Sequence, residues 1–254
     1  MVSVLDDTID QQDISCESQI LSLKPIYLDS LIFPKLDSSD VMIHHYAYSM
    51  VYDNVYEQAK WVCYKISNAF EAGGYERTNS FKEDPLVLEG SASHSDYKGS
   101  GYDRGHLAPA GDMTWSKMAM EESFYYSNIS PQTPSFNRGI WKRLESRVRI
   151  WGTEFDSLYV VTGPVLIDSL EFIGAGVSIP NHFYKTVVSF KTGKPFSSIS
   201  FILENKGSKL KLNEFAISTD SLETICNMNF NYHLNRRLQD SLESNLDLSQ
   251  WSWP

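Results

Sequence analysis

The sequence has few cysteines, and their spacing is not that of a metal site. Its three cysteines are Cys16, Cys63 and Cys226, and no pair forms Cys-x-x-Cys. This argues against a structural zinc site, which usually contains such pairs. The odd number leaves at least one thiol unpaired within the chain. Buried free thiols are the ordinary outcome for cysteines of this kind.

Long apolar runs and repeats are also absent. No stretch approaches the roughly 18 apolar residues of a membrane span, so we expect no membrane association. The first residues, Met1-Val2-Ser3-Val4, contain neither the basic region nor the apolar core of a signal peptide. We find no repeat, low-complexity tract or linker. One folded domain, preceded by an arm, is the simplest account of 254 residues.

The sequence also lacks an excess of positive charge. The formal net charge is −10, which argues against a surface coated with basic residues. It does not exclude an enzyme acting on nucleic acid, because the local position of the cations decides binding. Hydrophobic residues make up 42% of the chain and aromatics 13%, which indicates a packed globular protein.

The order of patterns along the chain predicts an α+β fold. Residues 1–40 are polar and acidic, and we interpret them as a partly extended arm with a docked portion at 20–33; residues 41–254 form the main domain. Alternating or β-branched runs predict strands at 46–52, 58–66, 157–163, 182–190 and 197–203. We expect a central, mainly antiparallel sheet with helices packed on it.

Helical patterns are fewer. Apolar spacing predicts a helix at 137–150 with Asn137 as its N-cap, and a long helical tail at 221–246. The inner face of the tail is expected to consist of Leu222, Ile225, Phe230, Leu234, Leu238 and Leu242. Residues 115–126 form a short helix or turn. The glycine-punctuated segment 71–101 is predicted to be a loop.

The most informative stretch is 102–113, which contains one histidine, one arginine, two aspartates and two glycines. A neutral imidazole with an ordinary pKa of about 6.5 is the side chain best suited to taking a proton from water. His106 is therefore a candidate general base. Arg104 lies two residues earlier, so on a strand it would share a face with His106 and could bind a phosphate oxygen.

A second informative stretch follows. Asn137 and Glu145 would lie about 12 Å apart along a helix, so both are unsuited to bind one ion directly. One direct amide oxygen and one carboxylate acting through water fit Mg²⁺, with Mn²⁺ as an alternative, because Mg²⁺ retains much of its hydration shell. The same helix contains five cations, Arg138, Lys142, Arg143, Arg147 and Arg149. They are either a phosphate-binding patch or a solvated helix face; the histidine and amide nearby favour the patch.

These residues carry a resemblance. Asp103-Arg104-Gly105-His106, Asn-x-x-Pro-Gln from Asn128, and Asn-x-Gly-x-Trp from Asn137 occur in this order, followed by Leu144-Glu145. The chain resembles the DNA/RNA non-specific endonucleases of the endonuclease G-like type, from about Tyr46 to Leu242. The resemblance implies a ββα-metal (His-Me finger) active site.

The resemblance implies roles for single residues. His106 would be the general base, Asn137 the direct metal ligand and Glu145 a ligand through water. Asn128 would help to fix the site, and the phosphate would be bound by three arginines, Arg77, Arg104 and Arg149. Arg77 matches through a loosely spaced loop, and His182 is expected to be structural.

The expected function is metal-dependent hydrolysis of DNA and RNA with little sequence preference, leaving 5′-phosphate ends. Two alternatives stay open: a phosphodiesterase for smaller nucleotide substrates, and a catalytically silent relative that binds nucleic acid. By analogy with the family we also expect a homodimer, an inhibitor protein as a partner, and a secreted or periplasmic location.

Overall fold

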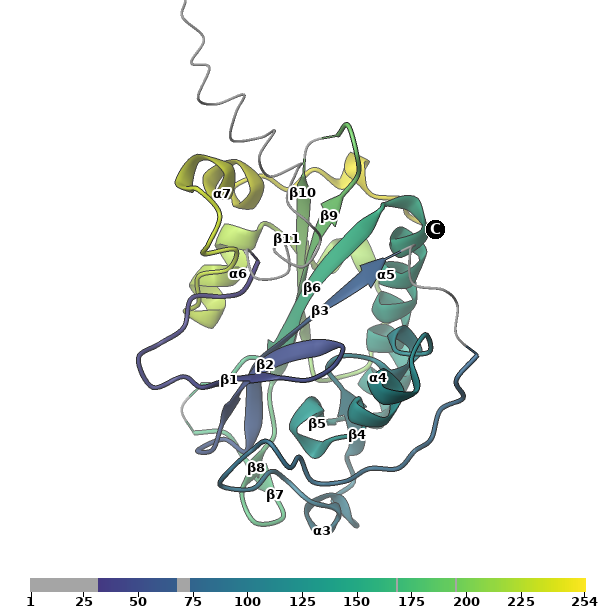
Figure 1. Cartoon of the computed structure of the whole chain (residues 1–254), viewed down its shortest axis with the longest axis vertical. Coiled ribbons are helices and arrows are strands. Elements are labelled where there is room, and N and C mark those ends of the chain that lie inside the picture. Colours follow the sequence, from purple (N-terminus) through teal and green to yellow (C-terminus); the bar gives the residue numbers. More distant parts are fainter. Residues whose placement is uncertain (1–31, 68–73, 168, 195) are drawn as a thin grey trace, which may run out of the picture.

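The protein is built around a seven-stranded antiparallel sheet (Figure 1). The computed structural model describes residues 32–67, 74–167, 169–194 and 196–254. The strands are, in spatial order, β1 (Met42–His44), β2 (Tyr48–Asp53), β3 (Gln58–Ser67), β6 (Ser157–Pro164), β9 (His182–Phe190), β10 (Ser197–Glu204) and β11 (Ala216–Ile217). The predicted α+β class with a mainly antiparallel sheet is confirmed.

Helices cover both faces of this sheet. Helix α5 (Lys142–Glu154) lies on one face, and α6 (Thr219–Cys226) and α7 (Arg236–Glu243) lie on the other (Figure 1). Successive side chains of a strand point to opposite faces. In β3, Val62 therefore joins the core beneath α5, whereas Trp61 joins the core beneath α6 and α7.

A small two-stranded sheet beside the main sheet leads into α5. Strand β4 (Asp103–His106) pairs antiparallel with β5 (Ile129–Gln132), and the chain continues through η3 (Phe136–Trp141) into α5. The two strands pack closely at Gly105, where an added Cβ would lie 2.1 Å from the Gln132 side chain and would force that side chain to move. This strand–strand–helix unit is the predicted ββα finger.

Short elements complete the fold. Between the two strands of the finger lie η1 (Ala110–Asp112), α4 (Lys117–Glu122) and η2 (Tyr126–Asn128). Elsewhere are α3 (His94–Tyr97), β7 (Phe172–Ile173), β8 (Val177–Ser178), η4 (Leu212–Phe215) and η5 (Leu248–Gln250). The four-residue α3 lies within the segment predicted to be a loop, because one helical turn is too short to show an apolar period.

The prediction that Asn137 caps a helix is wrong. Asn137 lies inside the irregular turn η3, in which Gly139 has non-helical dihedrals. The N-cap of η3 is Ser135. The side chain of Asn137 donates instead to Asp103, across the finger. A tertiary partner therefore replaces the local capping role.

The predicted tail helix is two helices. Asn227, at φ 51°, ends α6 in the left-handed conformation, and the Asn235 side chain begins α7 by accepting from the Leu238 amide. Most of the expected inner face does pack on the sheet, but Ile225 is 45% exposed and was wrongly included. An asparagine in the left-handed conformation stops a helix without the glycine that usually marks such a stop.

Most of the predicted N-terminal arm, including most of its docked portion, lies outside the described residues. Of the part described, Ile32 is buried and Phe33 packs against Trp61 with ring centroids 5.8 Å apart. The boundary at residue 40 stays a prediction. None of the described helices is long and apolar enough to cross a membrane.

Candidate active site

A cavity of about 440 Å³ opens where β4 of the finger faces the start of α5. Its lining combines a histidine, an amide, a carboxylate and five cations. These are His106, Asn137, Glu145, Arg77, Arg104, Arg138, Lys142 and Arg149. The cavity therefore brings together most of the residues expected to act on a phosphodiester.

His106 is buried at 7% exposure, and its Nε2 atom has no hydrogen-bond partner. Its ring packs edge-on against Phe124, with centroids 4.9 Å apart. Burial, reinforced by Arg77 and Arg104, lowers the pKa of His106 to about 3. The imidazole is therefore neutral at physiological pH, the protonation state in which a histidine can accept a proton.

Two phenylalanines hold the arginines beside this histidine. The Arg104 guanidinium lies over the Phe81 ring at 4.0 Å, and Arg77 lies over Phe124 at 5.1 Å. Such stacking fixes a planar cation without neutralising it. Arg104 and His106 line the same cavity, as their spacing on β4 predicts. Phe81 and Phe124 were not expected at the site, because in the sequence they look like ordinary core residues.

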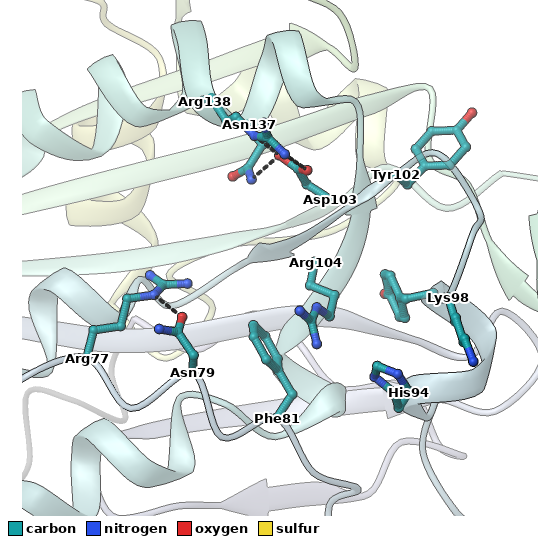
Figure 2. Close-up of a pocket in the computed structure, with 11 residues that line it drawn as sticks. Arg77, Asn79, Phe81, His94, Lys98, Tyr102, Asp103, Arg104, Asn137 and Arg138 are labelled. Atoms are coloured by element: carbon teal, nitrogen blue, oxygen red, sulfur yellow. Dashed lines mark hydrogen bonds and ion pairs between the residues drawn. The ribbon is translucent and has the colours of Figure 1, made fainter.

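Asn137 is tied to Asp103 at the cavity rim. Its Nδ2 atom donates to Asp103 Oδ2 at 2.9 Å, and Figure 2 shows its amide oxygen on the other side. Arg138 donates to both oxygens of Asp103, at 2.5 and 2.7 Å. Burial alone would raise the pKa of Asp103, but these hydrogen bonds hold it below its usual value. Asp103 thus orients the amide and stays ionised.

Glu145 lies across the cavity, next to a buried ion pair. Arg149 Nη1 donates to Asp112 Oδ1 at 2.7 Å, and the Asp112 side chain is fully buried. Burial raises the pKa of Glu145 above its ordinary value, and the cations Lys185 and Arg149 oppose this shift. Arg149 is therefore engaged by a carboxylate while it still lines the cavity.

Lys185 is a site neighbour that the sequence analysis missed. It is fully buried in β9, and its Nζ lies 5.0 Å from the Trp141 ring centroid and 3.5 Å from Tyr64 Oη. Burial lowers the pKa of Lys185 to about 8, although the nearby carboxylates of Glu145 and Asp112 act in the opposite direction. In the sequence Lys185 lies in an alternating strand pattern, and that pattern does not indicate that its side chain lies next to the site.

Asn128 does not line the cavity but lies behind the chain that follows His106. It is fully buried, its Oδ1 accepts from the Ala108 amide, and its Nδ2 donates to the carbonyls of Ala108 and Ser123. All its polar atoms are thus used to hold the chain that follows His106. This geometry supports a role in fixing the site and leaves no atom for substrate.

Three other predicted residues lie elsewhere. Arg143 and Arg147 are not among the cavity residues, and Arg143 donates to the Leu210 carbonyl at 3.3 Å. On α5, Arg143 and Arg147 are four residues apart and so share a side, which differs from the side of Lys142 and Arg149 that lines the cavity. His182 lies at the start of β9 and lines two other cavities.

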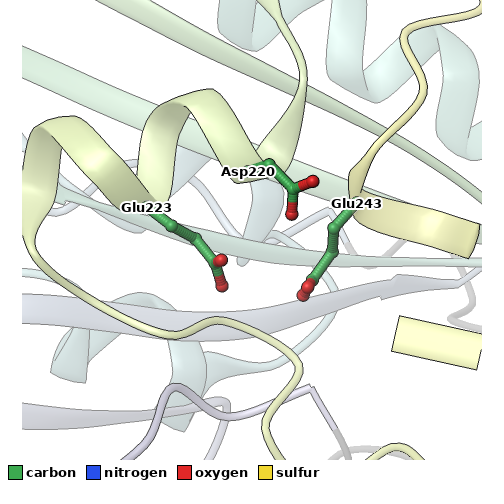
Figure 3. Close-up of side chains that lie close together, drawn as sticks. All are labelled: Asp220, Glu223 and Glu243. Carbon is green, nitrogen blue, oxygen red and sulfur yellow. The ribbon is translucent and has the colours of Figure 1, made fainter. Parts of the chain in front are cut away.

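The donor atoms of the cavity fit a hard divalent cation. Asn137 offers an amide oxygen and Glu145 a carboxylate, and oxygen donors are what Mg²⁺ and Mn²⁺ prefer. Away from this cavity, three carboxylates, Asp220, Glu223 and Glu243, have ligand atoms within 4.8 Å of one another (Figure 3). Unlike this cluster, the cavity that contains His106 combines oxygen donors with a histidine and arginines.

Comparison with known proteins decides the family. The model of the DNA/RNA non-specific endonuclease family matches residues 33–237. The chain belongs to this family. This confirms the resemblance seen in the finger motifs.

Individual relatives of this endonuclease family agree. The chain is 34% identical to mitochondrial nuclease EXOG of Homo sapiens over 207 residues, 74% of this chain and 56% of the relative. It is 31% identical to mitochondrial endonuclease G of Homo sapiens over 192 residues, 70% of this chain and 65% of the relative. The chain thus spans somewhat more than half the length of these relatives.

A solved structure of the endonuclease family has the same fold. It is described as "Crystal structure of the EndoG/EndoGI complex: Mechanism of EndoG inhibition". The TM-score is 0.74 at 28% identity, and the match covers 85% of this chain and 95% of that chain. The expected secreted or periplasmic location is wrong, because EXOG and endonuclease G are named as mitochondrial proteins.

Proposed function

We propose that this chain hydrolyses phosphodiester bonds of DNA and RNA with the help of a divalent cation and with little sequence preference. The observation that carries the proposal is a neutral histidine, His106, that lines one cavity with Arg104 and Asn137. Family membership and the nuclease relatives support it. Phosphate contacts carry no sequence information, so weak specificity is expected.

The residues suggest how the reaction proceeds. His106 takes a proton from water, the water oxygen bonds to phosphorus, and the bond to the 3′ oxygen breaks, which leaves a 5′-phosphate. Arg104, held over Phe81, and Arg77, held over Phe124, balance the negative charge that develops on the phosphoryl oxygens. The 3′ oxygen finally takes up a proton from solvent.

A divalent cation would be held by Asn137 directly and by Glu145 through water. When bound, it would stabilise charge on the phosphoryl group and on the departing oxygen. Asp103 orients Asn137 for this task, because it fixes the amide nitrogen and so directs the oxygen away from itself. Mg²⁺ is the ion we propose, with Mn²⁺ as a substitute.

The test uses supercoiled plasmid and single-stranded RNA as substrates. We expect cleavage of both with Mg²⁺, none with excess chelator, and 5′-phosphate ends on the products. No cleavage of either substrate with Mg²⁺ or Mn²⁺ by folded protein would contradict the proposal. A homodimer and an inhibitor partner stay predictions, and the solved complex of EndoG with EndoGI supports the second.

A further inference from the structure

A second cavity adjoins the one that contains His106. Its volume is about 360 Å³, and it shares four residues with the first, Arg77, Arg104, Asn137 and Arg138. From there it extends to His94 and Lys98 on α3, on the far side of Arg104 (Figure 2). A volume of this size lies in the range of ligand sites. The two cavities therefore form one continuous groove along the finger.

Helix α3 is anchored by its last two residues, Asp96 and Tyr97. Asp96 accepts from the backbone amides of Ser93 and Ala175, both at 2.8 Å, which ties α3 to the turn between β7 and β8. Tyr97 is buried, and its hydroxyl donates to the Ile129 carbonyl at 3.3 Å. The anchors fix α3 against β5, which belongs to the finger itself.

The first residue of α3 and the residue after its last face the groove. His94 and Lys98 are both exposed, are four residues apart and so lie on one side of the turn. Both line the second cavity. Because α3 is anchored, a ligand of these two side chains would have a defined position relative to His106.

The second cavity has an excess of positive charge. Arg77, Lys98, Arg104 and Arg138 line it, and Asp103 is its single carboxylate. Asp103 is already bonded to Arg138. Among the described residues Lys98 has no ion-pair partner, in contrast to Arg138. The cavity is therefore suited to an anion in addition to the phosphate beside His106.

We propose that Lys98, with His94 beside it, binds the phosphate that adjoins the scissile phosphodiester on the same strand. The inference rests on the proposed function, since it assumes that His106 faces the scissile group. It makes Lys98 a determinant of substrate class. A chain with neighbouring phosphates gains a contact that an ester with a single phosphodiester lacks.

The experiment compares two substrates and two variants of the full chain. The substrates are bis(p-nitrophenyl) phosphate, which has one phosphodiester, and a short single-stranded oligodeoxynucleotide. The variants are Lys98→Ala and a matched control, Lys209→Ala, which removes an exposed lysine outside both cavities. Thermal melting of each variant verifies the fold.

For Lys98→Ala we expect kcat/KM on the oligonucleotide to fall about tenfold, as for loss of a charged hydrogen bond. The salt dependence of oligonucleotide binding should lose about 0.7 of a unit of slope, the value of one phosphate contact on a single strand. The activity on bis(p-nitrophenyl) phosphate should be unchanged. Lys209→Ala should match the parent in all three measurements.

Equal oligonucleotide kinetics and equal salt slopes in Lys98→Ala and Lys209→Ala would overturn the inference. Equal losses on both substrates would also overturn it, because Lys98 would then act on the reacting phosphate or on the fold. A parent protein that cleaves neither substrate would contradict the proposed function itself. The two failures are thus distinguishable.

Discussion

The molecule contains two groups of acidic side chains that differ in their surroundings. In the finger, Asp103 is paired with Arg138 and Asp112 with Arg149, and Glu145 is influenced by Lys185. On the other face of the sheet, the carboxylates of Asp220, Glu223 and Glu243 lie together (Figure 3). Glu223 accepts a hydrogen bond from the Phe230 amide, and Glu243 accepts one from the Asn231 side chain.

The difference in neighbouring cations shows which acidic group is suited to act on a phosphodiester. Carboxylates alone repel an anionic substrate, so a site must also supply cations that face the phosphate. In the cavity of the finger five cations accompany Glu145. In the cluster behind the sheet, burial and the nearby carboxylates of Glu223 and Asp220 together raise the pKa of Glu243 to about 8. Proximity of carboxylates there reflects packing of α6 against α7.

The strongest test of this comparison removes the base of the finger. His106→Ala should reduce plasmid cleavage by about 10²–10⁴-fold, the usual contribution of general base catalysis. Melting temperature and nucleic-acid binding should show that the variant is folded and still binds. A folded variant that cleaves at nearly the parental rate would remove His106 from the mechanism.

The next test separates the two oxygen donors. Asn137→Ala should cost more than Glu145→Gln, because it removes the direct ligand, whereas glutamine keeps an oxygen that water can bridge. For Glu145→Gln we expect a loss of about 10–100-fold in activity or in affinity for the cation. Titration of Mg²⁺ and Mn²⁺ against cleavage rate measures both. The coordination would be refuted by equal metal affinity in Asn137→Ala and the parent.

A smaller effect distinguishes two adjacent cations of α5. Lys142 lines the cavity, whereas Arg143 is bonded to the Leu210 carbonyl outside it. Lys142→Ala should therefore reduce the salt slope of DNA binding by about one unit and raise KM several-fold. Arg143→Ala should leave the slope unchanged. Equal slopes in the two variants would mean that the whole helix face contacts DNA or that none of it does.

The smallest effect concerns the acidic cluster behind the sheet. The pKa of Glu243 rises from 4.5 to about 8 on folding, so the folded state binds more protons between these values. Stability is then lost as pH rises through this window. Glu243→Gln should raise Tm by about 2–4 °C at pH near 9 and leave it unchanged near pH 4.

The same variant also tests the comparison directly. Because Glu243 lies away from His106, Glu243→Gln should cleave plasmid at the parental rate. Loss of cleavage in a folded Glu243→Gln protein, or loss of a Mg²⁺-induced rise in Tm, would show that the acidic cluster contributes to metal binding.

The sequence by itself determined the strands and the finger. Their patterns are local: alternation in β3, β6 and β9 reports which face each side chain occupies, and the spacing of Arg104 and His106 places both on one side of β4. The start of α5 and the single tail helix were mispredicted because Asn137 and Asn227 respond to partners and dihedrals that periodicity does not report.

Only the tertiary structure decided which charges act together. Helical geometry turns Lys142 and Arg149 towards the cavity and Arg143 and Arg147 away from it, a distinction that charge counting along the chain does not make. Lys185 reaches the site from β9, which is distant in sequence from the finger, and the position of Lys98 depends on the contacts of α3 with the β7–β8 turn and with β5. Their roles depend on burial and on long-range packing, and those properties exist only once the chain has folded.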